Sequence, residues 1–353
     1  WHEAEFSGRK ISFFPLFDLP EDNVRQLVPT SVRYTLALLK QDLSSDFMLF
    51  YRLEPSVAAL KWPGRKLLYV ANDIYQKVKS SEKHRGSLWK RVPWLYFTLE
   101  KVLIQQFDAV LYCNSGSIQF YQEQHPAIAD RITYVRNTVD DEVFYPVSDA
   151  AKTACQQALA REISLPEDTQ FLLFAGRLHP QKDPLLLVQS MASVQNANAH
   201  LLMAGEGELM SAVHQEIERL NLAHRVTLLG SVDQTRLAAL YHAASAFVLS
   251  SVYEGLPIVA LEALASGIPV ITTRAGDTPE ILTSRSGIVC EERTAEKITQ
   301  AIDHLLAHAE LYPQEACTQA VRPYIGRHVV GDICADMLRH SKKQNPGVLS
   351  TVA

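Results

Sequence analysis

Short apolar runs alternate with longer amphipathic segments along the second half of the chain. The runs have the length of buried strands, and the segments between them carry apolar residues at helical spacing. The expected strands are Phe171–Ala175, His200–Ala204, Val226–Gly230, Ala246–Ser250 and Pro269–Thr273. The expected helices are Leu185–Val194, Leu209–Leu220, Leu237–Ala244 and Leu256–Leu264. This alternation predicts a doubly wound parallel sheet covered by helices on both faces.

The first half has the same pattern in a less regular form. Its expected strands are Phe47–Tyr51, Lys66–Ala71, Ala109–Cys113 and Ile132–Val135. Its expected helices are Arg33–Leu39 and Leu95–Gln106. Periodicity is lost over Asn137–Asp149, which also carries Pro146, so we place the interdomain linker there. The chain is therefore expected to be an α/β protein with two Rossmann-like domains.

A length of 353 residues is about twice that of a usual single domain. We expect an N-terminal domain over residues 1–143, a C-terminal domain over 144–320, and a helix with a frayed tail over 321–353 that packs back on the body. The first ten residues, WHEAEFSGRK, are typical of a loop, and we expect a short N-terminal segment to be missing before them.

Charge and cysteine content exclude several classes of protein. The formal net charge of -5 argues against a general nucleic-acid binder, which needs a broad basic surface. The five cysteines are scattered without C-x-x-C spacing, so neither a zinc site nor a disulfide framework is indicated, and a reducing cytoplasm fits best. No run of about 18 apolar residues is present, so no segment is expected to span a membrane.

Two acids in the segment Ser250–Thr273 are candidates for binding a ligand. In a doubly wound sheet, ligands bind outside the carboxyl ends of the strands, where free N–H groups at a helix N-terminus suit a phosphate. Glu254 and Glu262 are eight residues apart, slightly more than two helical turns, so both are expected on one side of a helix, facing one ligand. A solvated helix face explains either acid alone, but Glu262 lies in an apolar stretch where an unpaired acid is costly to bury.

Two cations follow another expected strand. Arg177 and Lys182 lie in the text FAGRLHPQKD, just past the carboxyl end of the strand, where they can neutralise a diphosphate. The alternative interpretation is a surface ion pair with Asp183. His179 in the same loop is the one histidine that is a candidate for contact with the donor, although a histidine exposed to solvent is the favoured interpretation.

Gly205 and Gly207 come directly after the next strand. Glycines there permit close approach of a ligand to the backbone, although a plain turn explains them equally well. Neither G-x-G-x-x-G nor G-x-x-x-x-G-K-[ST] occurs in the chain, which counts against dehydrogenases and P-loop NTPases.

Taken together, GRLHPQKD, AGEGE, EGLPIVALE, ASGIPVITT and GDTPEIL resemble the donor-binding domain of the family 4 retaining glycosyltransferases, which belong to glycosyl transferases group 1. NTVDDEVFYP resembles the linker of that family, and the resemblance is strong over Asn137–Leu282. It implies the GT-B fold, in which two Rossmann-like domains face a cleft.

The resemblance also implies a role for each matching residue. Arg177 and Lys182 would hold the donor diphosphate, and Glu262 would accept hydrogen bonds from the ribose hydroxyls. Glu254 would hold the transferred sugar and the distal phosphate together with the backbone of Gly255, Leu256, Pro257 and Ile258. The nucleotide pocket would be lined by Gly176, Gly205, Glu206 and Gly207.

Three features depart from the family pattern. The first strand and glycine-rich loop of the N-terminal domain have no match here. The histidine that the family commonly places beside the acceptor corresponds to Asn72, followed by Asp73, and Arg52 is a further candidate on the acceptor side. The Gly-Gly that the family has near the sugar appears as Gly276-Asp277.

The implied function is retaining transfer of a sugar from a nucleotide-diphosphate donor to a glycan or lipid-linked acceptor, without metal or cofactor, as in polysaccharide biosynthesis. A UDP-sugar is favoured, with GDP-mannose next. The alternatives are a nucleotide-sugar epimerase on the same scaffold and a non-catalytic nucleotide-sugar binding subunit. Residues 77–97 interleave six Lys or Arg with aromatic residues, which fits either peripheral contact with the inner face of the cytoplasmic membrane or a basic loop before a core-facing helix.

Overall fold

A computed structural model describes residues 2–6, 9–13, 30–41, 43, 45–70, 93–113, 115 and 118–333. Contacts divide the chain between Tyr134 and Val135 into two compact units, which are described separately. The segment after Tyr134, which includes the expected linker, is therefore counted with the second unit.

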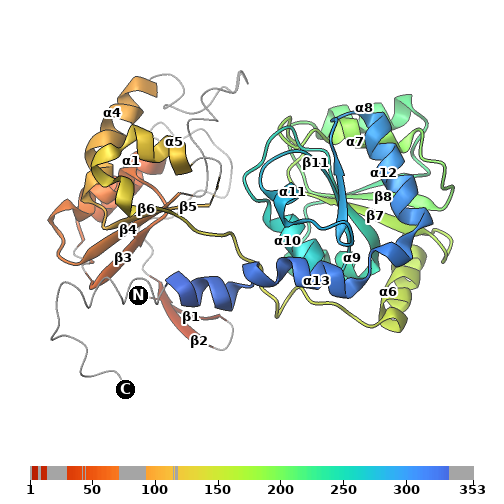
Figure 1. Ribbon diagram of the computed structural model, residues 1–353, viewed down its shortest axis with the longest axis horizontal. Helices are drawn as coiled ribbons and strands as arrows, with labels where there is room; N and C mark the ends of the chain where they lie inside the picture. The colour runs from red at the N-terminus through yellow and green to blue at the C-terminus, as the bar shows by residue number, and fades with distance from the viewer. Residues whose placement is uncertain are drawn as a thin grey trace. The chain divides into compact units, whose positions relative to one another are not determined.

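The second unit is built on a six-stranded parallel sheet in the order β12-β11-β10-β7-β8-β9 (Figure 1). The strands are β7 (Gln170–Ala175), β8 (Ala199–Ala204), β9 (Val226–Gly230), β10 (Ala244–Leu249), β11 (Val270–Thr273) and β12 (Gly287–Cys290). Five of the six were expected from the sequence, with bounds that differ by at most two residues. The short strand β12 was not expected, because four residues that include a glycine give little periodicity to detect.

Helices cover both faces of this sheet. They are α6 (Asp149–Glu162), α7 (Pro184–Met191), α8 (Met210–Arg219), α9 (Gln234–Ala243), α10 (Ile258–Ala265), α11 (Thr278–Ile281), α12 (Ala295–Ala307) and α13 (Gln314–Val321). Successive side chains of β7 enter two different apolar clusters: Phe171 and Leu173 pack with α6, α9, α10 and α13, whereas Leu172 and Phe174 pack with α7, α8 and α12. A strand buried on both faces must be apolar throughout, which is why the strands of this half are easily recognised in the sequence.

The first unit contains four parallel strands in the order β3-β4-β5-β6: β3 (Phe47–Phe50), β4 (Arg65–Val70), β5 (Ala109–Tyr112) and β6 (Ile132–Tyr134). Its helical segments are α1 (Thr30–Leu38), η1 (Glu54–Lys61), α4 (Pro93–Leu103), η2 (Ile104–Gln106), α5 (Ile118–Gln124) and η4 (Pro126–Arg131). All four strands and both long helices expected here are confirmed.

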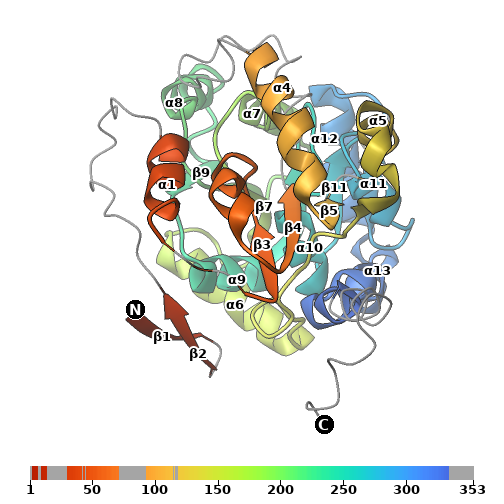
Figure 2. The same ribbon diagram turned by 90° about the vertical axis from the view of Figure 1, so that its left-hand side faces the viewer.

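The start of the chain is not a loop, contrary to expectation. β1 (His2–Phe6) and β2 (Arg9–Phe13) form an antiparallel two-stranded sheet of their own (Figure 2). Charged residues on both strands obscure the alternation of apolar and polar residues in this segment, so the sequence pattern did not reveal the hairpin.

The end of the described chain lies against the segment that follows β6. After η5 (Ala309–Leu311) and η6 (Arg322–Tyr324), Ile325 forms a parallel bridge with Val139, and residues 326–333 are helical. The amide of Val139 donates to the carbonyl of Tyr324 at 3.0 Å, and the amide of Gly326 donates to the carbonyl of Val139 at 3.0 Å. The start of the C-terminal helix therefore lies against the linker, and this helix begins at Gly326 and not at the expected Val321, which is the last residue of α13.

Candidate functional site

The order of the strands points to one place in the second unit. The chain runs outward from β7 to β8 and β9, returns to β10 beside β7, and then runs outward to β11 and β12. In such a sheet the crevice for a ligand opens where the winding direction reverses, outside the carboxyl ends of the two central strands. The loop after β7 begins at Gly176, and the loop after β10 begins at Ser250. These are the two segments that the sequence analysis selected on chemical grounds.

Hydrogen bonds join the two loops. The amide of Val252 donates to the carbonyl of Gln181 at 2.8 Å, and the side-chain amide of Gln181 donates to the carbonyl of Tyr253 at 3.1 Å. The hydroxyl of Ser250 lies 2.9 Å from the carbonyls of both Lys182 and Asp183. The loops therefore form one supported structure, and the position of each depends on the other.

The centre of this structure is an ion pair between Lys182 and Glu254. Their Nζ and Oε1 atoms lie 2.6 Å apart, and the hydroxyl of Ser251 donates to the same carboxylate oxygen at 2.6 Å. The side chains are 18% and 7% exposed, so the pair is largely enclosed. Thr273, at the end of β11, donates to the carbonyl of Ser251 at 2.7 Å and so holds the serine in place. The sequence alternative, in which the loop cation pairs with Asp183, is not what the structure shows for Lys182. Asp183 instead pairs with Arg293.

Gly205 and Gly207 pack directly on the loop after β7. A methyl group at Gly205 would lie 2.0 Å from the carbonyl oxygen of Gly176, and one at Gly207 would lie 2.3 Å from that of Leu178. The backbone of Gly205 also has a φ of +135°, which side chains rarely adopt. Both glycines are therefore required by the close approach of two backbone segments. From the sequence, only the approach of a ligand and a plain turn were weighed for these glycines, and not this packing role.

The two glutamates do not share one face of a helix, so that expectation is wrong. α10 begins at Ile258, after Pro257 as its N-cap, which leaves Glu254 in the preceding loop. Proline in this position removes a backbone donor that has no intrahelical acceptor and so marks the start of the helix. The eight-residue spacing therefore separates a loop acid from a helix acid.

Glu262 lies within α10 and contacts a buried tyrosine from α9. The hydroxyl of Tyr241 lies 3.2 Å from Oε2 of Glu262 and donates to the carbonyl of Val259 at 2.9 Å. Burial raises the pKa of Glu262 to about 7, and the hydrogen bond from Tyr241 acts in the opposite direction. Burial also raises the pKa of Tyr241, which keeps its proton at any physiological pH.

The other expected donor residues differ in their exposure to solvent. Arg177 and Glu206 are exposed, Leu256 and Pro257 are buried, and Ile258 is exposed. The amide of Asp277 donates to the carbonyl of Gly255 at 2.8 Å, which places the Gly276-Asp277 segment beside the loop of Glu254.

His179 is buried rather than exposed to solvent, contrary to expectation. Its Nδ1 accepts from the amide of Gln181 at 3.1 Å, so the ring shapes the loop before Lys182.

The acceptor-side residues are placed only in part. Asn72 and Asp73 lie outside the described residues, as does most of the basic stretch from 77 to 97. Arg52 is exposed just beyond the end of β3.

Several supporting residues were missed by the sequence analysis. Ser251, Thr273, Gln181 and Tyr241 act through hydrogen bonds to residues far away in the chain, which no local pattern encodes. Asn137 belongs to the same group, because its side-chain amide donates to the carbonyl of Leu256 at 2.6 Å. The only signal in the sequence for Asn137 was its place in the linker-like text NTVDDEVFYP.

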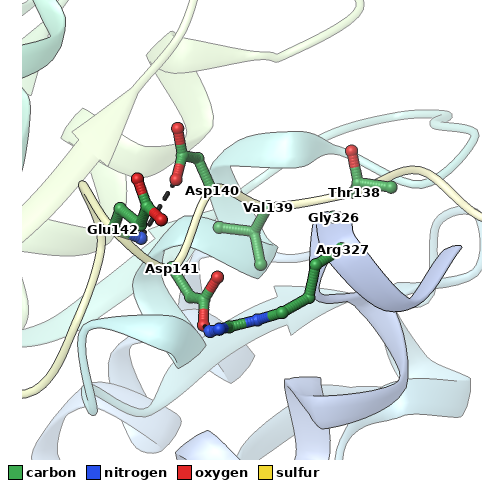
Figure 3. Close-up of a pocket in the computed structure, with 7 residues that line it drawn as sticks. All are labelled: Thr138, Val139, Asp140, Asp141, Glu142, Gly326 and Arg327. Carbon is green, nitrogen blue, oxygen red and sulfur yellow. Dashed lines mark hydrogen bonds and ion pairs between the residues drawn. The ribbon is translucent and has the colours of Figure 1, made fainter. Parts of the chain in front are cut away.

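A pocket of about 270 Å³ lies at the linker and not at these loops. It is lined by Thr138, Val139, Asp140, Asp141, Glu142, Gly326 and Arg327. Figure 3 shows Arg327 reaching across the pocket to Asp141, with which it forms an ion pair. The pocket marks the junction between the linker and the C-terminal helix.

Comparison with known proteins shows what the second unit and the fold resemble. Residues 156–320 match the family model described as glycosyl transferases group 1. An uncharacterized glycosyltransferase of Methanocaldococcus jannaschii is 34% identical over 42% of this chain and 38% of its own length. The chain spans about half the length of other curated relatives that it matches.

Solved structures extend the likeness to the whole fold. Sucrose-phosphate synthase from Thermosynechococcus elongatus has a TM-score of 0.74 at 20% identity, and the match covers 97% of this chain and 86% of the synthase chain. HepE of Anabaena in complex with UDP-glucose has a TM-score of 0.71 at 15% identity, and the match covers 89% of this chain and 83% of the HepE chain. The chain has the GT-B fold. The domain over residues 156–320, somewhat less than half of the chain, is similar to the glycosyl transferases group 1 family.

Proposed function

We propose that this protein is a retaining glycosyltransferase that uses a nucleotide-diphosphate sugar as donor. The observation that carries the proposal is the Lys182–Glu254–Ser251 cluster at the reversal point of the sheet, within a domain similar to the glycosyl transferases group 1 family. A largely enclosed lysine paired with an oriented acid, at the place where a doubly wound sheet binds ligands, suits a sugar joined to a diphosphate.

The proposed chemistry depends on stabilising the leaving group. Negative charge builds up on the nucleoside diphosphate as its bond to the sugar breaks, and Lys182 and Arg177 neutralise it together with the N-terminus of α10. Glu254, held at Oε1 by Ser251, accepts hydrogen bonds from the transferred sugar through Oε2. The acceptor hydroxyl attacks on the face that the diphosphate leaves, and a donor phosphate oxygen takes its proton. In this scheme the protein's cations replace a metal ion.

A UDP-sugar is the favoured donor, with GDP-mannose next. Support comes from the HepE structure, which contains UDP-glucose in a protein of the same fold. In this chain Glu262 would bind the ribose, and the backbone of Gly205–Gly207 with Gly176 would line the nucleotide pocket.

The proposed acceptor is a glycan or a lipid-linked glycan, with Asn72, Asp73 and Arg52 on the acceptor side. On α4, the helix that follows most of the basic stretch, Trp94 is 65% exposed and Val102 is 67% exposed. An exposed aromatic residue beside many cations suits peripheral contact with an anionic membrane on the cytoplasmic side. None of the helices in the described part of the chain has the length and apolar character to cross a bilayer.

A thermal-shift screen of nucleotide sugars tests the donor, because a ligand that binds only the native state raises the midpoint of unfolding. Turnover is then measured with candidate acceptors. Release of free nucleoside diphosphate that requires an acceptor supports transfer. A changed sugar without an acceptor would instead identify an epimerase, and binding without turnover in any condition would identify a binding subunit.

Flotation with vesicles of anionic and of neutral phospholipid tests the membrane contact. We expect binding to anionic vesicles that weakens in Trp94→Ser. Leu311→Ser, which changes an exposed apolar residue of the second unit, is the matched control. Equal flotation of both variants and of the unmodified protein would argue against contact through α4.

A further inference from the structure

The hydroxyl of Tyr241 has no part in the chemistry proposed above, although it is fully buried beside a candidate ligand-binding acid. The ring packs between Phe144 and Phe247, with centroids 5.7 Å away in each case. This packing fixes the ring, so the hydroxyl oxygen stays between the carbonyl of Val259 at 2.9 Å and Oε2 of Glu262 at 3.2 Å.

A phenol carries one proton, so Tyr241 can donate to only one of these two oxygens at a time. When Glu262 is protonated, its carboxyl donates to the phenol oxygen, the phenol donates to Val259, and every group is paired. When Glu262 is ionised, the phenol proton must turn to the carboxylate, where the hydrogen bond is charge-assisted. Val259 tolerates this loss, because it lies in the first turn of α10 and its carbonyl accepts a backbone N–H within the helix.

Burial favours the first arrangement. Glu262 is buried among apolar residues of α10, and burial raises its pKa to about 7. In the described part of the chain, Tyr241 is the one titratable group that contributes to this pKa, through its hydrogen bond. A bound ribose reverses the preference, because its two hydroxyls are donors and an ionised carboxylate accepts at both oxygens.

We propose that Tyr241 and Glu262 form a proton-coupled nucleotide-binding pair, an inference that rests on the nucleotide-sugar site proposed above. When the nucleotide sugar binds, Glu262 releases its proton to solvent and the hydroxyl of Tyr241 turns from Val259 to Oε2. The ionised carboxylate, held by Tyr241, then accepts hydrogen bonds from the ribose hydroxyls. Tyr241 is thus a positioning residue that acts through Glu262.

Calorimetry of nucleotide-sugar binding in buffers of different ionisation enthalpy counts the released protons. UDP-glucose and GDP-mannose are suitable probes, since their diphosphates have no proton to exchange near pH 7. We expect release of about one proton per bound ligand at pH 6, about half a proton at pH 7 and almost none at pH 9. Affinity should fall by about tenfold per pH unit below pH 6.

Three variants separate the proposal from a purely structural role. Glu262→Gln should bind weakly, without proton release and without the pH dependence. Tyr241→Phe should move the midpoint of the pH dependence upward and raise the KM for donor more than it changes kcat. Tyr312→Phe, which removes a buried tyrosine hydroxyl from the other apolar cluster of this unit, should match the unmodified protein.

Nucleotide-sugar binding without proton release at any pH would overturn the coupling and leave the proposed function standing. A pH midpoint in folded Tyr241→Phe equal to that of Tyr312→Phe would show that Tyr241 has no part in it. If Tyr241→Phe does not fold, the proton counts of the unmodified protein and Glu262→Gln decide. Failure of the folded, unmodified protein to bind any nucleotide sugar between pH 6 and 9 would overturn the proposed function itself.

Discussion

The ammonium of Lys182 and the carboxylate of Glu254 lie 2.6 Å apart although 72 residues separate them in the chain. Each is supplied by the loop after one of the two central strands, β7 and β10. The pair exists because the parallel sheet places the carboxyl ends of neighbouring strands side by side, and the first two of the following predictions depend on it.

Removing either loop cation should reduce turnover without unfolding the protein. For Arg177→Ala and Lys182→Ala we expect a loss of about 10²–10³-fold in kcat, the range observed when one group that stabilises transition-state charge is removed. Lys297→Ala, an exposed lysine of the same unit, is the control. Steady-state kinetics with circular dichroism gives both readouts, and near-normal transfer in both loop variants would rule out the assignment.

Ser251→Ala should weaken the orientation of Glu254. The serine hydroxyl donates to Oε1 inside a buried site, so its loss is expected to reduce kcat by roughly tenfold and to cost about 1 kcal/mol of stability. The salt bridge to Lys182 remains, so the effect should be smaller than that of Lys182→Ala. Equal losses in the two variants would mean that the serine, not the lysine, organises the acid.

Gly205→Ala should destabilise the second unit. The added methyl group would lie 2.0 Å from the carbonyl oxygen of Gly176, so the two loops must move apart, at a cost of about 2–4 kcal/mol. Gly331→Ala is the matched control, because that glycine lies in the helix 326–333 with no atom within 4 Å of the added group. There alanine should be neutral or stabilising by up to about 1 kcal/mol. Chemical denaturation of both variants checks the contrast.

Glu262→Gln should stabilise the protein at alkaline pH. The pKa of Glu262 is raised from 4.5 to about 7 in the folded state, so between these values the folded protein holds a proton that the unfolded chain has lost. Stability conferred by this group therefore falls as pH rises through that window, by about 3 kcal/mol in total. Glutamine does not ionise and avoids the loss. The midpoint of thermal unfolding should be higher than that of the unmodified protein at pH 8.5 and similar at pH 4.5.

The sequence determined the architecture of the second unit. Strands such as β7 are buried on both faces, so their apolar character is continuous and visible without any tertiary information. Short elements such as β12 and the strands of the β1–β2 hairpin have no such constraint, and their residues did not reveal them.

The sequence also selected Lys182, Glu254 and Glu262, because a charged side chain directly after an apolar strand, or within an apolar helix, is unusual enough to require a reason. Only the tertiary structure decided how these groups are paired. Glu254 lies in the loop before the helix that contains Glu262, and Lys182 forms an ion pair with Glu254 and not with Asp183. The hydroxyl of Tyr241 lies within hydrogen-bond distance of Glu262. The physical reason is that an ion pair or hydrogen bond depends on a separation of about 3 Å in space, and chain folding brings such atoms together regardless of their distance in sequence.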